Sequence, residues 1–584
     1  MRSTSILLLS VLLLLLLLCI QAITSACTTS PSFDEPYHIV RSYVYLKTGD
    51  SALVARGGHP PLANMLSVIP LLLRSDIVLP AHQPGWPDVS SFKDLFRVAD
   101  QFFWRLGNDA ESIVSWARLP MVLLSALLAV LVFSWAKQLH GALAGLLALV
   151  LYTFDPNIIA HSSVVTTDFG ATFFIFVSIY CLWRFCQKPS WSRLLVTGIV
   201  FGLAQATKFS ALFLFPIFVV LLAIGVPGTA GSALPFVLPG QSRFSGRPRL
   251  QRLYIVLALC CVMFVVGSIV LWGVYGLEVG PLVPHEDSHP LLDGFIPGNN
   301  PSIKRAVYAL AENLPIPAPA YFSDFAWLRR YTRAGHPAFL MGRYAVRGWW
   351  FYFPIAFAIK TPIPLLILLA VAICLSLRHR EELSREYFLL VPMVFLFLAS
   401  MFSPIDIGYR NILPVLPVAF VYVSKVSTLF IKGRVVGWPT PRWGRSALGL
   451  LCAWYIIGTV ALSPHYLAYF NEFVGGPDNG FRYLVDSNLD WGQDLKHLKK
   501  YMDGGGIQQV YLSYFGTADP TYYGIDFLPV PDCPPDPDDP LAYYVISATS
   551  LQGVYARGTT SPHWLAQYQP VARVGYSIFV YRLP

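Results

Sequence analysis

The chain has 584 residues, of which 55% are hydrophobic and only 13% are charged, whereas about a quarter of the residues in soluble proteins are charged. This composition excludes an ordinary soluble globular protein, because the apolar residues gather in runs of roughly 16 to 22, the length that crosses a bilayer as a helix. The net charge of +9 requires no nucleic-acid partner, since part of it marks the loops on one side of the predicted membrane.

The first apolar run extends from Ile6 to Ile23, behind Arg2, and is followed by the small residues Thr24, Ser25 and Ala26. Two interpretations stay open for it, a first membrane span or a cleaved signal segment. In both cases the chain from Cys27 onward is delivered to the outside of the membrane.

Hydropathy predicts about eleven spans, and hence a polytopic α-helical protein of the plasma or inner membrane. The spans are expected near residues 6–23, 119–136, 142–155, 168–186, 194–208, 209–226, 253–274, 353–377, 387–403, 411–430 and 446–463. With the N-terminus inside, the short cytoplasmic loops carry Lys137; Arg184, Lys188 and Arg193; Arg243, Arg247, Arg249 and Arg252; Arg378, Arg380 and Arg385; and Lys432, Arg434, Arg442 and Arg445. This repeated positive charge is what the positive-inside rule expects of cytoplasmic loops.

Three long segments then lie outside the cytoplasm, at about 24–118, about 275–352 and after about 464. The last segment contains strand-like stretches at 509–515, 542–548 and 577–583, and a helical pattern at 490–502 that stops at three glycines. We therefore expect a transmembrane module at 1–463 and a small extracytoplasmic α/β domain at 464–584.

The first external segment opens with the acidic pair Asp34 and Glu35, near the start of a helix predicted at 33–46. Glu35 can cap this helix, because Pro36 suits its first position. An ordinary solvated pair is the simpler interpretation, but the pair lies within about a dozen residues of the first span and so stays near the membrane. A second short helix is expected at 302–313.

Four ionisable residues fall at or inside predicted spans, and all of them lie near the outer leaflet: Asp168, Lys208, Lys360 and Arg410. Burying such groups in a membrane costs a few kcal/mol each, so their coincidence suggests a polar cavity. Snorkelling of the long side chains toward the headgroups is the alternative. It fits Lys360 least well, because this residue lies about ten residues past Trp350 and is followed by the helix-breaking Pro362.

His59 begins the rigid stretch His59-Pro60-Pro61-Leu62, in which prolines alone could explain a turn. A polar contact or ligand role for His59 is the alternative. Asp155 and Thr167 flank a predicted external loop and could simply be helix caps.

Together these elements resemble the lipid-carrier-dependent glycosyltransferases of the GT-C fold, in particular the protein O-mannosyltransferase and aminoarabinose transferase group. The resemblance rests on the order and common leaflet of several motifs. They are Asp34-Glu35, His59-Pro-Pro-Leu, the loop 155–168, Gly202-Leu-Ala-Gln-Ala-Thr-Lys208-Phe-Ser, Lys360-Thr-Pro and Gly408-Tyr-Arg410-Asn-Ile-Leu-Pro.

The resemblance implies a donor sugar on a polyprenyl or dolichyl phosphate, transferred outside the cytoplasm with inversion. It makes Asp34 the match for the catalytic base, with Glu35 beside it. Fixed positive groups would stabilise the leaving phosphate, and the candidates are Arg410, Lys208, Lys360 and Arg343. A divalent cation held by Glu35 and Asp168 is a further possibility that no His/Cys cluster supports. The segment after Asn471 is not the β-trefoil of eukaryotic O-mannosyltransferases, so the acceptor, whether protein, lipid or glycan, stays open.

Two other function classes stay open on the sequence. A transporter or lipid flippase would also place polar groups in its spans, although no halves with matching broken spans are recognisable. A membrane receptor would use the C-terminal region to bind a partner.

Overall fold

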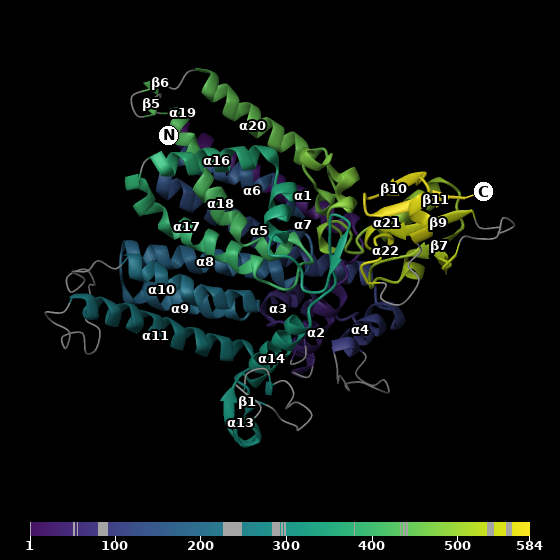
Figure 1. Ribbon diagram of the computed structural model, residues 1–584, viewed down its shortest axis with the longest axis horizontal. Coiled ribbons are helices and arrows are strands. Elements are labelled where there is room, and N and C mark those ends of the chain that lie inside the picture. The colour runs from purple at the N-terminus through teal and green to yellow at the C-terminus, as the bar shows by residue number, and fades with distance from the viewer. Residues whose placement is uncertain are drawn as a thin grey trace.

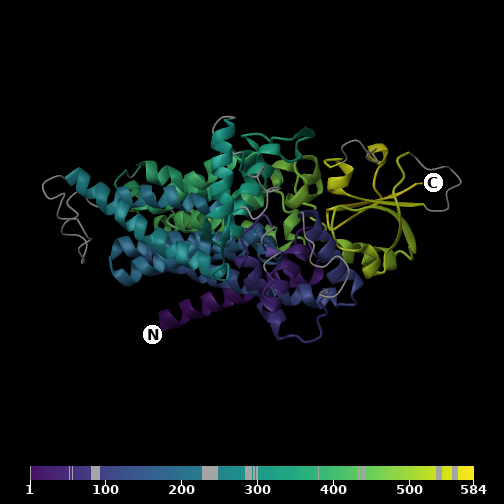
Figure 2. The same cartoon turned by 90° about the horizontal axis from the view of Figure 1, so that it is seen from below.

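The computed structural model describes residues 2–50, 53–54, 57–79, 92–225, 248–282, 292–293, 296, 300–378, 380–431, 434–435, 438–439, 442–533, 542–555 and 563–583. Most of these residues are helical. The helices form an elongated bundle, and a mixed β-sheet lies at the end where the C-terminus is found (Figure 1). Seen from below, the N-terminal helix extends away from the sheet (Figure 2).

Four helices in the described part of the chain are long and apolar enough to cross a membrane. They are α1 (Arg2–Thr28), α5 (Ala110–His140), α8 (Thr167–Gln187) and α11 (Pro248–Val274). Two bent pairs raise this number to six if each pair is one span. The pairs are α6 (Ala142–Thr153) with α7 (Pro156–Ser162), bent by 62°, and α15 (Tyr352–Lys360) with α16 (Ile363–Arg378), bent by 113°. The protein is therefore a multi-pass membrane protein.

The full set of eleven spans stays a prediction, because the other apolar helices are short or begin with charged residues. They are α9 (Trp191–Gln205), α10 (Leu214–Gly225), α17 (Arg380–Met401), α18 (Val415–Val423), α19 (Val426–Ile431) and α20 (Arg442–Val460). About 20 apolar residues cross a bilayer as one helix. Of the predicted cytoplasmic basic residues, Arg243, Arg247 and Lys432 lie outside the described residues.

Glycines bring two of the bundle helices close together. A Cβ on Gly202 of α9 would lie 2.5 Å from the backbone oxygen of Gly267 in α11, and one on Gly198 would lie 2.9 Å from Val266. Since no side chain stands between them, the two backbones can approach, as small residues allow in membrane helices.

Further short elements precede the C-terminal sheet in the sequence. They are α2 (Glu35–Thr48), α3 (Leu62–Val68), α4 (Phe92–Asp100), α13 (Pro301–Asn313) and α14 (Pro319–Ala334), with the two-stranded pairs β1 (Val279–Pro281) with β2 (Pro315–Pro317) and β3 (Ala338–Leu340) with β4 (Arg343–Ala345). Helix α2 begins at Glu35 with Pro36 in its first turn, and α13 occupies the second predicted external helix. Both short helices were predicted correctly.

The C-terminal region forms a five-stranded mixed sheet in the order β10-β11-β9-β7-β8. The strands are β7 (Gln509–Ser513), β8 (Asp526–Pro529), β9 (Tyr543–Ser547), β10 (Ala572–Val574) and β11 (Ile578–Arg582). Strand β7 pairs in parallel with β8 and β9, and the pairs β9 with β11 and β10 with β11 are antiparallel. The three stretches predicted as strands, 509–515, 542–548 and 577–583, contain β7, β9 and β11 respectively. Helix α21 (Leu495–Gly504) packs on the sheet and begins later than predicted.

The stretch from His465 to Asp494 connects the bundle to this sheet, and much of it is buried. Its backbone carbonyls accept hydrogen bonds from the segment just after α1: Ser30 N donates to Gln493 O at 2.9 Å, and Phe33 N donates to Trp491 O at 2.8 Å. The residues around the acidic pair are therefore held by chain that lies more than four hundred residues later.

Candidate active site

Four charged side chains predicted from separate motifs form one chain of ion pairs. Asp34 Oδ2 lies 2.9 Å from Arg410 Nη1, which lies 3.7 Å from Asp168 Oδ2. Asp168 Oδ1 in turn pairs with the Lys208 ammonium, which also donates to Asn411 Oδ1 at 3.3 Å. Two carboxylates and two cations thus alternate, which lowers the cost of placing each charge away from bulk water.

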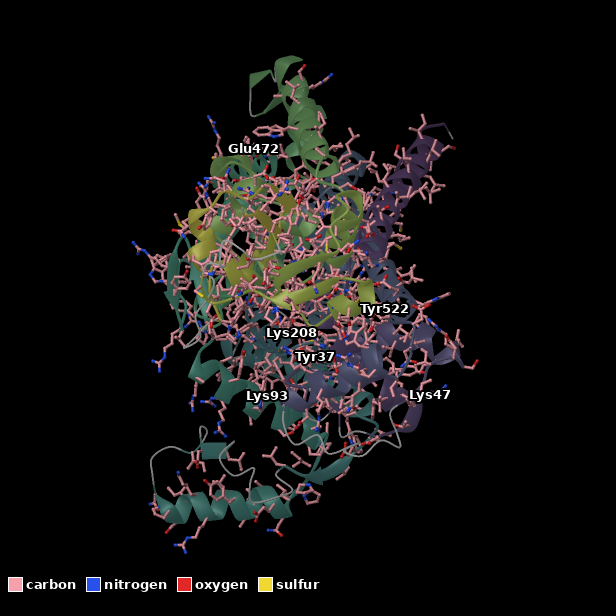
Figure 3. The ribbon with its side chains drawn as sticks, turned by 90° about the vertical axis from the view of Figure 1, so that its right-hand side faces the viewer. Tyr37, Lys47, Lys93, Lys208, Glu472 and Tyr522 are labelled. Atoms are coloured by element: carbon pink, nitrogen blue, oxygen red, sulfur yellow. The ribbon has the colours of Figure 1, made fainter. Side chains whose placement is uncertain are left out.

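Each member of this cluster stands where a helical element begins. Asp34 directly precedes α2, and Asp168 lies in the first turn of α8, where the helix dipole favours a carboxylate. Lys208 precedes the short 3-10 helix Phe209–Phe213, and Arg410 belongs to the 3-10 helix Tyr409–Ile412. The four positions converge although they come from four separate parts of the chain. Figure 3 looks from the side of the C-terminal sheet and labels Lys208 and Tyr37 near the centre of the view.

Asp34 combines burial with partial access. Burial raises the pKa of its carboxyl group, while the neighbouring Arg410 opposes this rise. The exposed fraction of its side chain is 20%. A carboxylate with a raised pKa that can still be reached is suited to accept a proton from a bound hydroxyl group.

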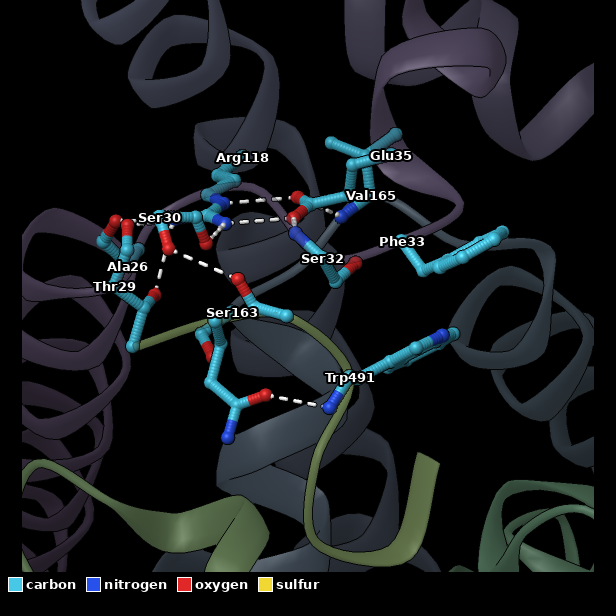
Figure 4. Close-up of polar contacts among 12 residues, drawn as sticks. Ala26, Thr29, Ser30, Ser32, Phe33, Glu35, Arg118, Ser163, Val165 and Trp491 are labelled. Atoms are coloured by element: carbon cyan, nitrogen blue, oxygen red, sulfur yellow. Dashed lines mark hydrogen bonds and ion pairs between the residues drawn. The ribbon is translucent and has the colours of Figure 1, made fainter. Parts of the chain in front are cut away.

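Glu35, the neighbour of Asp34, faces a different partner. Its carboxylate pairs with Arg118 of α5, with Nε donating to Oε1 at 2.9 Å and Nη2 to Oε2 at 2.6 Å (Figure 4). The backbone amides of Ser32 and Val165 also donate to it, at 2.7 and 2.8 Å. Both side chains are at most 1% exposed. The structure therefore does not bring Glu35 to the Asp34 cluster.

The predicted cation site of Glu35 with Asp168 has no support in this geometry. Each carboxylate is already engaged by a cationic side chain of its own, Arg118 for Glu35 and Lys208 for Asp168. No contact joins the two carboxylates among the residues that the structure describes. We do not carry this site into the proposed reaction.

Lys360 is fully buried at the sharp break between α15 and α16, away from the cluster. Its ammonium donates to the backbone oxygens of Leu467, at 3.0 Å, and Asn488, and lies 4.6 Å from the centre of the Phe470 ring. These are contacts that fix the stretch after α20. The helix break itself exposes carbonyl groups, which side-chain amides satisfy: Asn471 donates to Ala358 O and Thr361 O, at 2.7 and 2.9 Å.

His59 lies next to the cluster, and Arg343 does not. Burial and then the charge of Lys208 lower the pKa of His59 to about 3, so its ring is neutral at physiological pH. Its backbone oxygen accepts a hydrogen bond from Arg41 at 2.6 Å. Arg343 is exposed at the start of strand β4, and within the described residues it forms no ion pair with the four charges.

Several residues at this site carried no signal in the sequence. Trp491 places its ring 4.4 Å from the guanidinium carbon of Arg410, a cation–π contact. Asp486, which has a positive φ of 58°, accepts from Tyr555 and adds negative charge near Arg410. They come from the C-terminal region, so only the folded chain reveals that they border the cluster.

One known family matches part of the chain. Residues 101–237 match the family described as dolichyl-phosphate-mannose-protein mannosyltransferase. This match covers less than half of the chain and agrees with the resemblance predicted from the motifs. No curated protein sequence matches the chain at a significant level.

Some solved structures are similar over most of the chain at low identity. ArnT from Cupriavidus metallidurans bound to undecaprenyl phosphate is 11% identical with a TM-score of 0.44, covering 98% of this chain and 97% of that one. The Archaeoglobus fulgidus oligosaccharyltransferase tethered with an acceptor peptide is 12% identical with a TM-score of 0.42, covering 95% and 72%. The archaeal oligosaccharyltransferase AglB from the same organism, in complex with an inhibitory peptide and a dolichol-phosphate, has a TM-score of 0.39 at 11% identity and the same coverage.

Proposed function

We propose that the protein transfers a sugar, with inversion, from a polyprenyl or dolichyl phosphate to an acceptor hydroxyl on the extracytoplasmic side of the plasma membrane. The observation that carries this proposal is the ion-pair cluster that places the partly accessible carboxylate of Asp34 2.9 Å from Arg410. A base and a phosphate-binding cation are the two groups that such a transfer needs in one place.

In the proposed reaction, the Asp34 carboxylate takes the proton of the acceptor hydroxyl as its oxygen attacks the anomeric carbon. The bond from that carbon to the phosphate oxygen breaks on the opposite face, and the lipid phosphate leaves with the electron pair. Arg410 and Lys208 offset the charge that develops on the phosphate. Asp168 acts as a positioning residue, because it pairs with both cations.

The proposed function also gives a role to each of the two regions of the chain. The charged cluster belongs to the membrane module, residues 1–463, and residues 464–584 act as a support that contributes Trp491 and Asp486 to its border. The acceptor can be a protein, a lipid or a glycan. Comparing the lipids and glycans of cells with and without the gene would identify the sugar and its acceptor.

The direct test is the Asp34→Asn variant in nanodiscs, with Asp503→Asn as a matched control at an exposed acid of α21. We expect Asp34→Asn to lose at least about a thousandfold in transfer, within the range attributed to acid–base catalysis, and to keep its thermal stability and donor binding. Asp503→Asn should behave as the unaltered protein. Full transfer activity in Asp34→Asn would eliminate Asp34 as the base.

A further inference from the structure

Two histidines and an aspartate meet at the start of α21, outside the proposed active site. Asp494 Oδ1 lies 2.9 Å from His497 Nδ1 and 3.5 Å from His465 Nδ1, and the centres of the two imidazole rings lie 4.5 Å apart. Each of the three residues offers one ligand atom, and these atoms all lie within 4.8 Å of one another. No other group of three or more His, Cys, Asp or Glu residues in the described part of the chain meets this condition. None of them has a role in the proposed transfer.

The carboxylate of Asp494 is oriented so that one oxygen faces both histidines. Its other oxygen, Oδ2, accepts from Ser577 Oγ at 2.6 Å and from Gln493 Nε2 at 2.9 Å. Gly575 permits this arrangement, because a Cβ there would lie 2.2 Å from Asp494 Cγ, and its φ of +60° also favours glycine. Such hydrogen bonds to the far oxygen are what orient carboxylate ligands of metal sites.

We propose that His465 Nδ1, His497 Nδ1 and Asp494 Oδ1 form a binding site for a divalent transition-metal ion, with Zn²⁺ as the ion to test first. Bonds of about 2.0 to 2.1 Å at tetrahedral angles place ligand atoms about 3.3 Å apart. The two distances from Asp494 Oδ1 to the histidine nitrogens bracket this value. Two imidazoles and a carboxylate suit zinc and its first-row neighbours better than Ca²⁺ or Mg²⁺.

The surroundings of the three residues leave room for a fourth ligand. Asp494 is fully buried, whereas His465 and His497 keep 20% and 19% of their side-chain area exposed. Water can therefore complete a tetrahedral site from the exposed side. The metal would join the stretch that leaves α20, the start of α21 and, through Ser577, the turn between β10 and β11.

The proposed metal is also linked to the segment beside the active site. Gln493, which donates to Asp494 Oδ2, accepts from Trp491 N through Oε1 at 2.7 Å, and its backbone oxygen accepts from Ser30 N. Trp491 packs against Arg410. A bound ion would thus hold in place the loop that borders the cluster, as a structural clamp rather than a catalytic centre.

The test uses the full-length purified protein, stripped with a chelator and titrated with Zn²⁺ alone. We expect about one tightly bound ion per chain, and a double variant His465→Gln/His497→Gln that binds at least tenfold more weakly. His140→Gln is the matched control, because it removes one imidazole at the far end of α5. Zn²⁺ should raise the Tm of the unaltered protein and of His140→Gln, and leave that of the double variant unchanged.

A second readout does not depend on the variants. Co²⁺ added to the stripped, unaltered protein should give the intense visible absorption bands of a tetrahedral site, and added Zn²⁺ should remove them. Stoichiometric binding that persists in the folded double variant would overturn the proposal, as would the absence of both Zn²⁺ binding and tetrahedral Co²⁺ bands. These measurements require no transfer activity, so they stand apart from the outcome for Asp34.

Discussion

Arg410 occupies the centre of the charged cluster, between the carboxylates of Asp34 and Asp168 and against the ring of Trp491. In the proposed transfer this position gives it two effects. It offers positive charge to a leaving phosphate, and it opposes the rise that burial causes in the pKa of Asp34. The proposed base is therefore ionised at a lower pH than its burial alone would allow.

Arg410→Gln separates these effects in a pH profile. Asp34 must be a carboxylate to act as base, so activity falls as the pH drops through its pKa. Without Arg410 that pKa rises further, and we expect the acid limb of kcat/KM to move to higher pH. The exposed Arg482 provides the control variant Arg482→Gln. An acid limb that stays in place would show that Asp34 is not the titrating group.

Glu35→Gln distinguishes a structural from a catalytic role for the second acid of the pair. Because this change leaves the buried guanidinium of Arg118 uncompensated, we expect a loss of about 3 to 5 kcal/mol in the free energy of unfolding. Thermal melting in detergent measures it, and Glu35→Gln/Arg118→Met should recover part of the loss. Unchanged melting with abolished transfer would return Glu35 to the catalytic role that the sequence predicts.

At the scale of elements, the break between α15 and α16 shows how the bundle tolerates a sharp bend of 113°. The sequence indicated the break through Lys360 and Pro362, and it suggested a polar cavity there. The structure instead fills the position with protein: Asn471 donates to the backbone oxygens of Ala358 and Thr361 at the bend, and the Lys360 ammonium donates to backbone oxygens of the stretch after α20. Backbone carbonyls freed within a membrane are tolerated when protein satisfies them.

Asn471→Ala tests this account of the break. The variant leaves the carbonyls of Ala358 and Thr361 without their side-chain donor, and we expect it to lower the free energy of unfolding by about 1 to 3 kcal/mol. Asn479→Ala removes an exposed amide as the control.

Lys360→Met should likewise reduce stability without changing the KM for the lipid-linked donor. An increased KM in Lys360→Met at unchanged stability would support its predicted role in phosphate binding.

At the scale of the whole molecule, the sequence predicted the multi-pass architecture, the C-terminal α/β region and the common leaflet of Asp34, Asp168, Lys208 and Arg410. The architecture and the common leaflet were predicted from hydropathy and charge, which the membrane dictates directly, and the α/β region from strand-like stretches and a helix that stops at three glycines. It could not predict that Glu35 turns to Arg118, because adjacent residues at a helix start point in different directions. Nor could it reveal Trp491 or the Asp494 cluster, whose partners meet only through long-range packing.

In the proposed function, the C-terminal region supports the active site through Trp491 and Asp486. Trp491→Ala should reduce kcat/KM by roughly 2- to 30-fold, the equivalent of a cation–π contact of about 0.5 to 2 kcal/mol. Trp454→Ala, which removes a partly exposed indole bonded to Glu472, serves as the control. Deleting everything after Ser463 should abolish transfer and donor binding, so such a deletion cannot separate an enzyme from a receptor. Unaltered kinetics in Trp491→Ala would contradict the supporting role of this region.

The hydrogen bond from Ser30 to the loop at Gly492 spans 462 residues of sequence. A ribosome that adds about 5 to 20 residues per second needs roughly 20 to 90 seconds to cover that distance. During this interval Asp34 has been made while the carbonyls that fix its flanking residues do not yet exist. The surroundings of the proposed base are thus completed last although the base itself is made first, and a chain interrupted during synthesis would lack the contacts that hold the segment before it.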